Sequence, residues 1–198
     1  MSTAISGFLL GLSFIVAIGS QNAFVLRSGI RRQHVLSIVL TCAVSDAILI
    51  AAGVAGFGVI VERFPNIITI FRYFGAAFLV FYGGKSFLSA YRGGSTLKTD
   101  GADVSWASAV MMCVMFTWLN PHVYLDTVIL LGATSQQYQQ PWVFGFGAMT
   151  ASVIFFFSLG YGARSLSGFF ANPKAWQALD ILIGLTMWAI AFELLRET

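Results

Sequence analysis

The chain alternates between long apolar stretches and short polar ones, a pattern that is typical of membrane-spanning helices. Six apolar stretches are predicted to cross a bilayer, at about residues 4–26, 35–61, 66–90, 106–133, 141–163 and 175–193. Each is close to or above the length of about 20 apolar residues that one span needs. The only sizeable polar loop runs from Arg92 to Val104. We therefore expect an all-α polytopic membrane protein with six transmembrane helices.

The composition strengthens this prediction. Hydrophobic residues make up 58% and charged residues 10% of the 198 residues, whereas a soluble domain is about 25% charged. We expect one transmembrane domain over residues 1–198, with no separate soluble domain. Because the first 26 residues carry no charge, they lack the basic start of a signal peptide and are expected to form a retained first span. The net charge of +3 is expected to reflect loop placement in the membrane and not nucleic-acid binding.

The positive charges predict an orientation in the membrane. Loops that follow odd-numbered spans hold eight of the eleven Lys and Arg residues: Arg27, Arg31, Arg32, Lys85, Arg92, Lys98, Arg164 and Lys174. Lys and Arg accumulate on the cytoplasmic side of membrane proteins. We therefore expect these loops in the cytoplasm and both chain termini outside.

The two halves of the chain, about residues 1–92 and 106–198, resemble each other on either side of a cytoplasmic linker at about 93–105. Small or helix-breaking residues and an Asn interrupt both Gly19–Leu26 and Trp118–Leu125. Ser152 also occupies the place in the fifth span that Asp46 has in the second. Three spans per half force opposite orientations, which gives two inverted three-helix repeats with a site at the midplane helix breaks. Pro121 supports a break because it removes one backbone N–H and kinks the helix.

Two carboxylates, Asp46 and Asp126, are the only charges within their apolar stretches, residues 35–61 and 106–134. An ionisable group at that depth costs roughly 2.5–3.5 kcal/mol on insertion scales, which makes it a candidate functional residue. A structural carboxylate that is bonded to a neighbouring hydroxyl is the alternative. The pair favours a site for a cation, a proton, or both.

Other polar residues lie beside the predicted breaks. Asn22 and Asn120, and less strongly Gln21, are candidates for binding a substrate, although Asn also joins membrane helices. His122 suits either proton relay or packing. Asp180, near the start of the last span, is expected to meet water at the interface. Cys42 and Cys113 fall in apolar stretches and are expected to pack there, without a disulfide or a metal.

Motifs for catalysis are absent from the sequence. It has no GxSxG, no HExxH, no Walker A loop and no paired set of cysteines. We expect no enzyme activity, no cofactor and no metal site. Without a nucleotide site, any pumping must use an ion gradient.

Four stretches carry a resemblance to a known family: Gly19–His34, Ala43–Gly58, Thr117–Ala133 and Ser158–Asp180. With these stretches the chain resembles the LysE-type exporters of basic amino acids. The segment LNPHVYLDTV matches the basic-amino-acid branch, because many exporters of neutral amino acids keep Asn-Pro without the following His-x-Tyr-x-Asp. One departure is Ser20, where the family often has Pro.

This resemblance implies efflux of L-lysine or L-arginine across the bacterial inner membrane, driven by the proton motive force. It implies functional roles for Asp46 and Asp126 and a site-forming role for Gln21, Asn22, Asn120 and Pro121. His122 and Tyr124, in the same segment as Pro121, are further candidates for the site. An exporter of neutral amino acids such as homoserine is the alternative within the superfamily, and a channel or a scaffold subunit is the alternative outside it.

The physics suggests a mechanism for such an exporter. Asp46 would alternate between a carboxylate that pairs with the substrate's side-chain cation and a protonated acid that releases it. Asn22, Asn120 and free backbone N–H groups would bind the substrate's carboxylate. Asp126 would be a second cation partner, a gate or a proton relay.

The GxxxG spacing of Gly7 and Gly11 permits a homodimer without requiring one.

Overall fold

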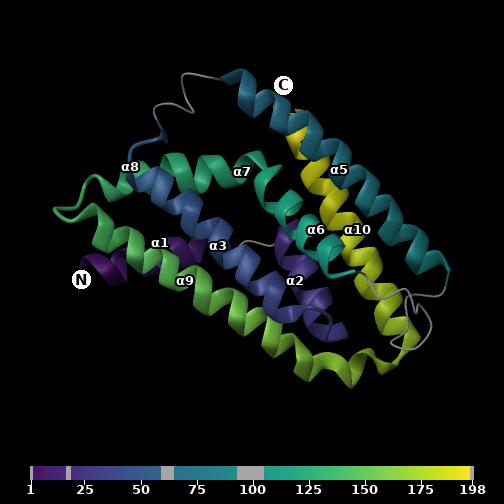
Figure 1. Cartoon of the computed structure of the whole chain (residues 1–198). Helices are drawn as coiled ribbons and strands as arrows, with labels where there is room; N and C mark the ends of the chain where they lie inside the picture. Colours follow the sequence, from purple (N-terminus) through teal and green to yellow (C-terminus); the bar gives the residue numbers. More distant parts are fainter. Residues whose placement is uncertain (1, 17–18, 59–64, 93–104, 197–198) are drawn as a thin grey trace.

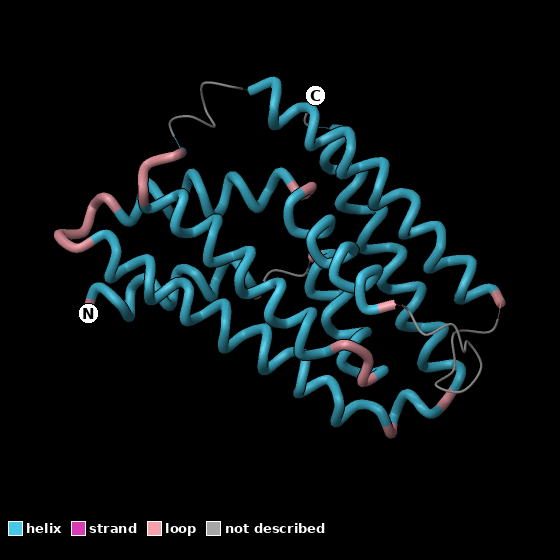
Figure 2. Tube along the Cα trace, viewed as in Figure 1, coloured by secondary structure: helices cyan, strands magenta, loops and turns pink. Residues whose placement is uncertain are grey.

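The computed structural model describes residues 2–16, 19–58, 65–92 and 105–196, and every regular element in this part of the chain is a helix (Figure 2). The first half contains α1 (Thr3–Ile15), α2 (Ser20–Arg31), α3 (Val35–Val54) and α5 (Pro65–Tyr91). The second half contains α6 (Trp106–Trp118), α7 (Pro121–Val123), a π-helix (Tyr124–Leu131), α8 (Gly132–Ser135), α9 (Pro141–Gly162) and α10 (Pro173–Arg196), with two short 3₁₀ helices, Ala163–Ser167 and Phe169–Ala171, before α10.

Length and composition support a polytopic membrane protein. Within the described residues, three helical stretches are long and apolar enough to cross a bilayer: Val35–Val54, Pro141–Ser167 and Pro173–Arg196. The number rises to as many as five if each of two bent helix pairs is one span. The all-α membrane fold is thus confirmed, while the six-span arrangement stays a prediction. The predicted linker at 93–105 lies almost entirely outside the described residues.

Two predicted spans are not continuous helices. The first divides into α1 and α2, whose axes differ by 84°, and the fourth divides at Asn120, where the axes differ by 61°. The sequence had indicated an interruption at both places. The helix, however, extends beyond residue 26, the predicted end of the first span. Helix α2 continues to Arg31, so Arg27 belongs to the helix and not to the loop that follows it.

The helix of the second predicted span ends before its apolar stretch does. Helix α3 ends at Val54, although the apolar stretch runs on to residue 61. Gly56 has a φ of +89°, a left-handed backbone conformation that glycine adopts without steric cost. The chain therefore turns at Gly56 although the hydrophobic pattern continues.

Figure 1 shows α5 lying along α10 at one side of the molecule and α9 lying along the other, with α3 between them. Helix α1 packs on α9, and α3 packs on both α9 and the π-helix. These contacts are close because they involve glycines. A side chain at Gly53 would collide with the backbone of Thr127 and Val128.

Gly7 and Gly11 lie in one of these close contacts. They are buried, and side chains placed on them would collide with Phe144 and Ala148 of α9. The GxxxG motif therefore joins two helices of one chain. The prediction that it offers a face for a homodimer is wrong, because α9 already covers that face.

Asp180 also differs from its prediction. Its side chain is 0% exposed, and its Oδ1 lies 3.2 Å from Nη1 of Arg27. The Ser89 hydroxyl donates to its Oδ2 over 2.7 Å. Asp180 is therefore a buried ion-pair partner that joins α10 to α2 and α5, and the prediction that it meets water is wrong. The apolar pattern could not show this, because the partner cation comes from a distant helix.

Cys42 and Cys113 pack as expected. Both are buried free cysteines, and their Sγ atoms lie 3.0 Å apart between α3 and α6. Phe116 of α6 extends the same core, where its ring contacts Phe24, Phe78 and Tyr82. This core holds α6 beside α2, α3 and α5, and so places the break that follows α6.

Candidate functional site

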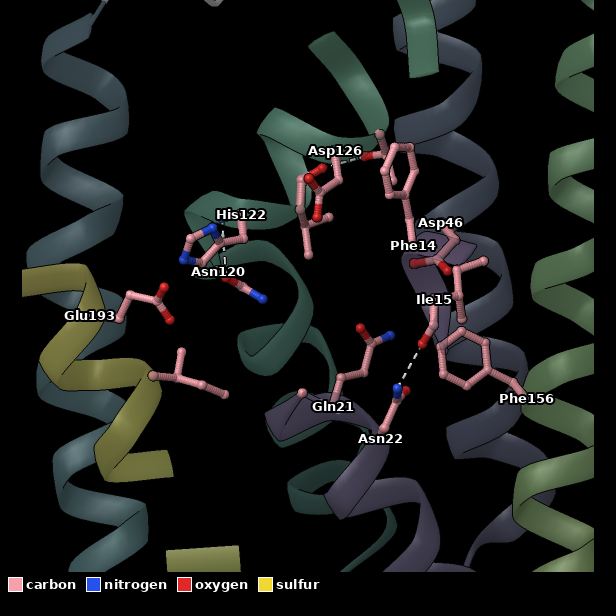
Figure 3. Close-up of a pocket in the computed structure, with 14 residues that line it drawn as sticks. Phe14, Ile15, Gln21, Asn22, Asp46, Asn120, His122, Asp126, Phe156 and Glu193 are labelled. Carbon is pink, nitrogen blue, oxygen red and sulfur yellow. Dashed lines mark hydrogen bonds between the residues drawn. The ribbon is translucent and has the colours of Figure 1, made fainter. Parts of the chain in front are cut away.

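A cavity of about 350 Å³ lies where the two helix breaks meet. Its volume is near the lower end of the roughly 300–1,000 Å³ of small-molecule pockets. Helices from both halves of the chain line it, and Figure 3 shows their polar groups directed into a common space. The lining residues are Phe14, Ile15, Gly19, Gln21, Asn22, Asp46, Asn120, His122, Val123, Asp126, Thr127, Phe156, Ile190 and Glu193.

The first break brings the beginning of α2 to the cavity. Gly19 is extended (φ −121°, ψ 169°) and makes no side-chain cap for the helix. The first N–H groups of a helix have no partners within the helix. The break also leaves carbonyls at the end of α1, and the Asn22 amide donates to Ile15 O over 2.7 Å. Asn22 therefore stabilises the break beside the cavity.

The second break is built in a similar way. Asn120 is extended, and its Oδ1 accepts a hydrogen bond from the N–H of His122 over 3.2 Å. Pro121 occupies the first helical position, where its missing N–H costs nothing. The Tyr124 hydroxyl donates to Trp118 O over 2.8 Å. Each break thus has a carbonyl that a side chain from the following helix satisfies. The amide NH₂ of Asn120 is its hydrogen-bond donor.

Asp46 lies near the middle of α3 and is 5% exposed. The Ser152 hydroxyl of α9 donates to its Oδ2 over 2.8 Å. Ser152 is the residue that the sequence comparison of the two halves places opposite Asp46. No Lys or Arg of the described residues forms an ion pair with this carboxylate, which nevertheless lines the cavity. Its charge is therefore available to a cation that enters.

Asp126 reaches the cavity from the π-helix. This winding is rare and is frequently found at functional sites, and here both Asp126 and Thr127 line the cavity. Asp126 is partly buried, and His122 interacts with it electrostatically. In Figure 3, Asp126 and Asp46 lie on the same side of the cavity as Phe14.

The charges of the lining have one predominant sign. Asp46, Asp126 and Glu193 are carboxylates, His122 is the single titratable nitrogen base, and no described lining residue is Lys or Arg. Amide groups of Gln21, Asn22 and Asn120 complete the polar surface. The Gln21 Nε2 atom is buried, and the side chain lies close enough to Asp46 and Cys42 to interact with both. The cavity thus offers carboxylates to a cation and an amide donor to an anion.

The structure brings six of the eight sequence-predicted site residues to this cavity: Gln21, Asn22, Asp46, Asn120, His122 and Asp126. Pro121 and Tyr124 do not line it. Pro121 is buried at the break, and the Tyr124 ring stacks on Phe71 with centroids 5.4 Å apart. Both residues therefore shape the site without facing its interior.

Sequence reasoning missed Glu193 and Ser152 as members of the site. A signal for Glu193 existed, because it is the only charge in the apolar stretch Ile181–Leu195. Its place at the end of the predicted last span made it resemble a residue at the membrane surface. Ser152 was noted only as the counterpart of Asp46, and sequence does not show that the two touch.

The bent apolar helices and the polar cavity between them define a multi-pass membrane carrier for a small polar solute. The family model for the LysE type translocator matches residues 12–198, and the chain belongs to this family. An arginine exporter protein, ArgO, of Yersinia enterocolitica is 40% identical over 202 residues, which cover 100% of this chain and 98% of the relative.

Further relatives cover comparable shares. The lysine exporter LysE of Corynebacterium diphtheriae is 34% identical over 228 residues and 100% of both chains. A Mycobacterium tuberculosis protein is 46% identical over 181 residues, which cover 91% of this chain and 90% of the relative. No solved structure matches the chain. The family and these names support amino-acid export by a transporter of the bacterial inner membrane.

Proposed function

We propose that the protein exports L-arginine, L-lysine or both from the bacterial cytoplasm and that the proton motive force drives the export. The observation that carries this proposal is the cavity at the two helix breaks, where three carboxylates and no described Lys or Arg line the wall. Such a lining favours a substrate with net positive charge. The arginine and lysine exporters among the relatives agree with this substrate class.

The cavity offers a partner for each end of a basic amino acid. Asp46, deep in the cavity and without a described cation, receives the substrate's side-chain cation. The substrate's carboxylate is bound by amide donors of Gln21 and Asn120 and by the uncapped N-terminus of α2, where backbone N–H groups and the helix dipole favour an anion. Asn22 contributes by holding the break open through its bond to Ile15 O.

Proton coupling follows from the chemistry of a carboxylate. Export of a cation from a negative interior is uphill by about 2.3 kcal/mol per charge per 100 mV, so an inward proton movement must offset it. A proton that reaches Asp46 from outside removes the charge that holds the substrate and so releases it. Loss of that proton to the cytoplasm restores the carboxylate. Asp126 and His122, which interact with each other, relay the proton or hold the leaving cation.

The proposed carrier has six spans in two inverted three-helix repeats, with both termini outside the cytoplasm. The two bent pairs, α1 with α2 and α6 with the helices after Asn120, occupy corresponding positions in the two halves. Asp46 and its counterpart Ser152 lie in contact, as residues near an axis between repeats do. In this arrangement the substrate site lies at the interface of the repeats, where secondary transporters place it.

The test is efflux of labelled arginine and lysine from proteoliposomes, with and without an imposed pH gradient, for the wild type and for Asp46→Asn. We expect efflux against a concentration gradient only when the pH gradient is present, and no such efflux from Asp46→Asn. A matched control is Thr150→Val, because Thr150 is an exposed residue of α9 that does not line the cavity.

Three outcomes would contradict the proposal. Normal export by Asp46→Asn would remove the central role of that carboxylate. Flux of both amino acids that never exceeds equilibrium would indicate a channel. Transport of neutral amino acids in place of basic ones would indicate the other branch of the superfamily.

A further inference from the structure

Glu193 lies on the opposite side of the cavity from the two aspartates that the family resemblance had indicated. Figure 3 shows Asp46 and Asp126 on one side, Glu193 on the other, and the side chains of Asn120 and Gln21 between them in this view. Ile190 and Glu193 are three residues apart on α10 and both line the cavity, because residues at that spacing share a helix face. Helix α10 therefore supplies a wall with one negative charge.

The two carboxylates of α10 have different surroundings. Asp180 is paired with Arg27, whereas the described residues provide no ion-pair partner for Glu193. Glu193 is also exposed, while Asp46 is 5% exposed. One end of the cavity is thus deep and the other open, and each end holds a carboxylate without a described cation.

A basic amino acid has two cationic groups, the α-ammonium and the side-chain cation, and a neutral amino acid has only the first. On the basis of the proposed function, the side-chain cation binds at the deep end with Asp46. The α-ammonium is then at the open end, beside the amides of Asn120 and Gln21 that bind the neighbouring carboxylate. We propose that Glu193 binds the α-ammonium group of the substrate and so makes the site select free amino acids over Nα-blocked ones.

The proposal makes Glu193 a specificity-determining residue that contacts the substrate. Its loss should weaken the binding of any ligand with a cation at the α position and spare ligands without one. The test is calorimetric titration of the purified full-length protein in lipid nanodiscs with three probes. Lysine carries both cations and the carboxylate, cadaverine carries both cations without the carboxylate, and Nα-acetyl-lysine carries the side-chain cation and the carboxylate without the α-ammonium.

For Glu193→Gln we expect affinity for lysine and for cadaverine to fall about tenfold, as the loss of one charge-assisted contact predicts. Affinity for Nα-acetyl-lysine should stay within about twofold of the wild-type value, because that probe never used the contact. Glu193→Asp keeps the charge and should recover most of the loss. Phe192→Leu is the control on α10, since Phe192 is 68% exposed and does not line the cavity.

The probes separate this proposal from the proposed function. Equal weakening of lysine and Nα-acetyl-lysine by Glu193→Gln would overturn the assignment, because it would show a general effect on the site. Unchanged affinity for lysine would overturn it as well. A wild-type protein that binds neither lysine nor arginine would instead overturn the proposed function, and that result appears before any variant is made. Retained binding of Nα-acetyl-lysine shows that the variant is folded.

Discussion

Asp46 and Asp180 are both buried carboxylates in apolar helices, and yet their surroundings differ. Asp180 is 0% exposed and is held by Arg27 and by the Ser89 hydroxyl, so its charge is neutralised within the protein. Asp46 is 5% exposed and accepts a hydrogen bond from Ser152. No described Lys or Arg accompanies it, and its remaining surface faces a cavity.

The difference shows that depth alone does not identify a functional carboxylate. Both side chains incur the cost of removing a charge from water, which an opposite charge must offset. At Asp180 the offsetting cation is a permanent part of the fold. At Asp46 the proposed cation is a substrate or a proton, which arrives and leaves. The partner, and not the burial, therefore separates a structural carboxylate from a transport site.

The same change at the two positions should have opposite effects. In Asp46→Asn we expect export to fall by roughly a hundredfold or more, because an amide neither balances a cation nor carries a proton. The folded protein should be as stable as the wild type, since no charge is left without its partner. In Asp180→Asn we expect the reverse, with a loss of about 3 kcal/mol in the free energy of unfolding because Arg27 loses its counterion.

Proteoliposome efflux per folded molecule and thermal unfolding in detergent measure the two effects separately. Asp180→Asn should keep most of its export activity per folded molecule. If Asp46→Asn proved unstable while retaining export, or if Asp180→Asn lost export while remaining stable, the roles of the two carboxylates would be exchanged.

A double variant sharpens the structural half of this comparison. Arg27→Gln alone leaves Asp180 charged and buried, and so should destabilise the protein by about 3 kcal/mol as well. The double variant with Arg27→Gln and Asp180→Asn removes both charges of this ion pair. Its loss in the free energy of unfolding should be clearly smaller than the sum of the losses in the two single variants. Thermal unfolding of the four proteins completes the cycle. Additive losses would show that Arg27 and Asp180 act independently.

The sequence predicted the membrane class and most of the cavity for a physical reason. A lone charge in an apolar stretch is conspicuous, and Asn or Pro at a helix break limits how the chain can continue. Asp46, Asp126 and Asn120 could therefore be located from composition and local pattern. The family resemblance then supplied the substrate class that the physics left open.

Other features depend on contacts between distant segments and could not be predicted in this way. The partner of Asp180 lies on α2, more than 150 residues away in the chain, so the carboxylate looked interfacial. The apolar stretch after Val54 concealed the turn at Gly56, because hydrophobicity does not report φ. Gly7 and Gly11 showed that a helix packs closely there, but not that its neighbour is α9 of the same chain.

The smallest expected effects come from the two serines that donate to these carboxylates. Each hydroxyl makes one hydrogen bond to an aspartate, Ser89 over 2.7 Å and Ser152 over 2.8 Å, so their alanine variants are matched. A hydrogen bond to a charged group contributes about 1.5–3 kcal/mol. In Ser89→Ala we expect a loss near the lower end of that range, because Arg27 still holds Asp180, with unchanged export.

Ser152→Ala should affect transport more than stability. Without the hydroxyl, Asp46 is oriented less firmly toward the cavity, and we expect export to fall by about threefold to tenfold, which corresponds to about 1 kcal/mol. Thermal unfolding should change little, because Asp46 can bind a proton when it loses its donor. If both serine variants lost stability equally and neither altered export, Asp46 would resemble Asp180, and the cavity would have to bind its substrate through Asp126 and Glu193 alone.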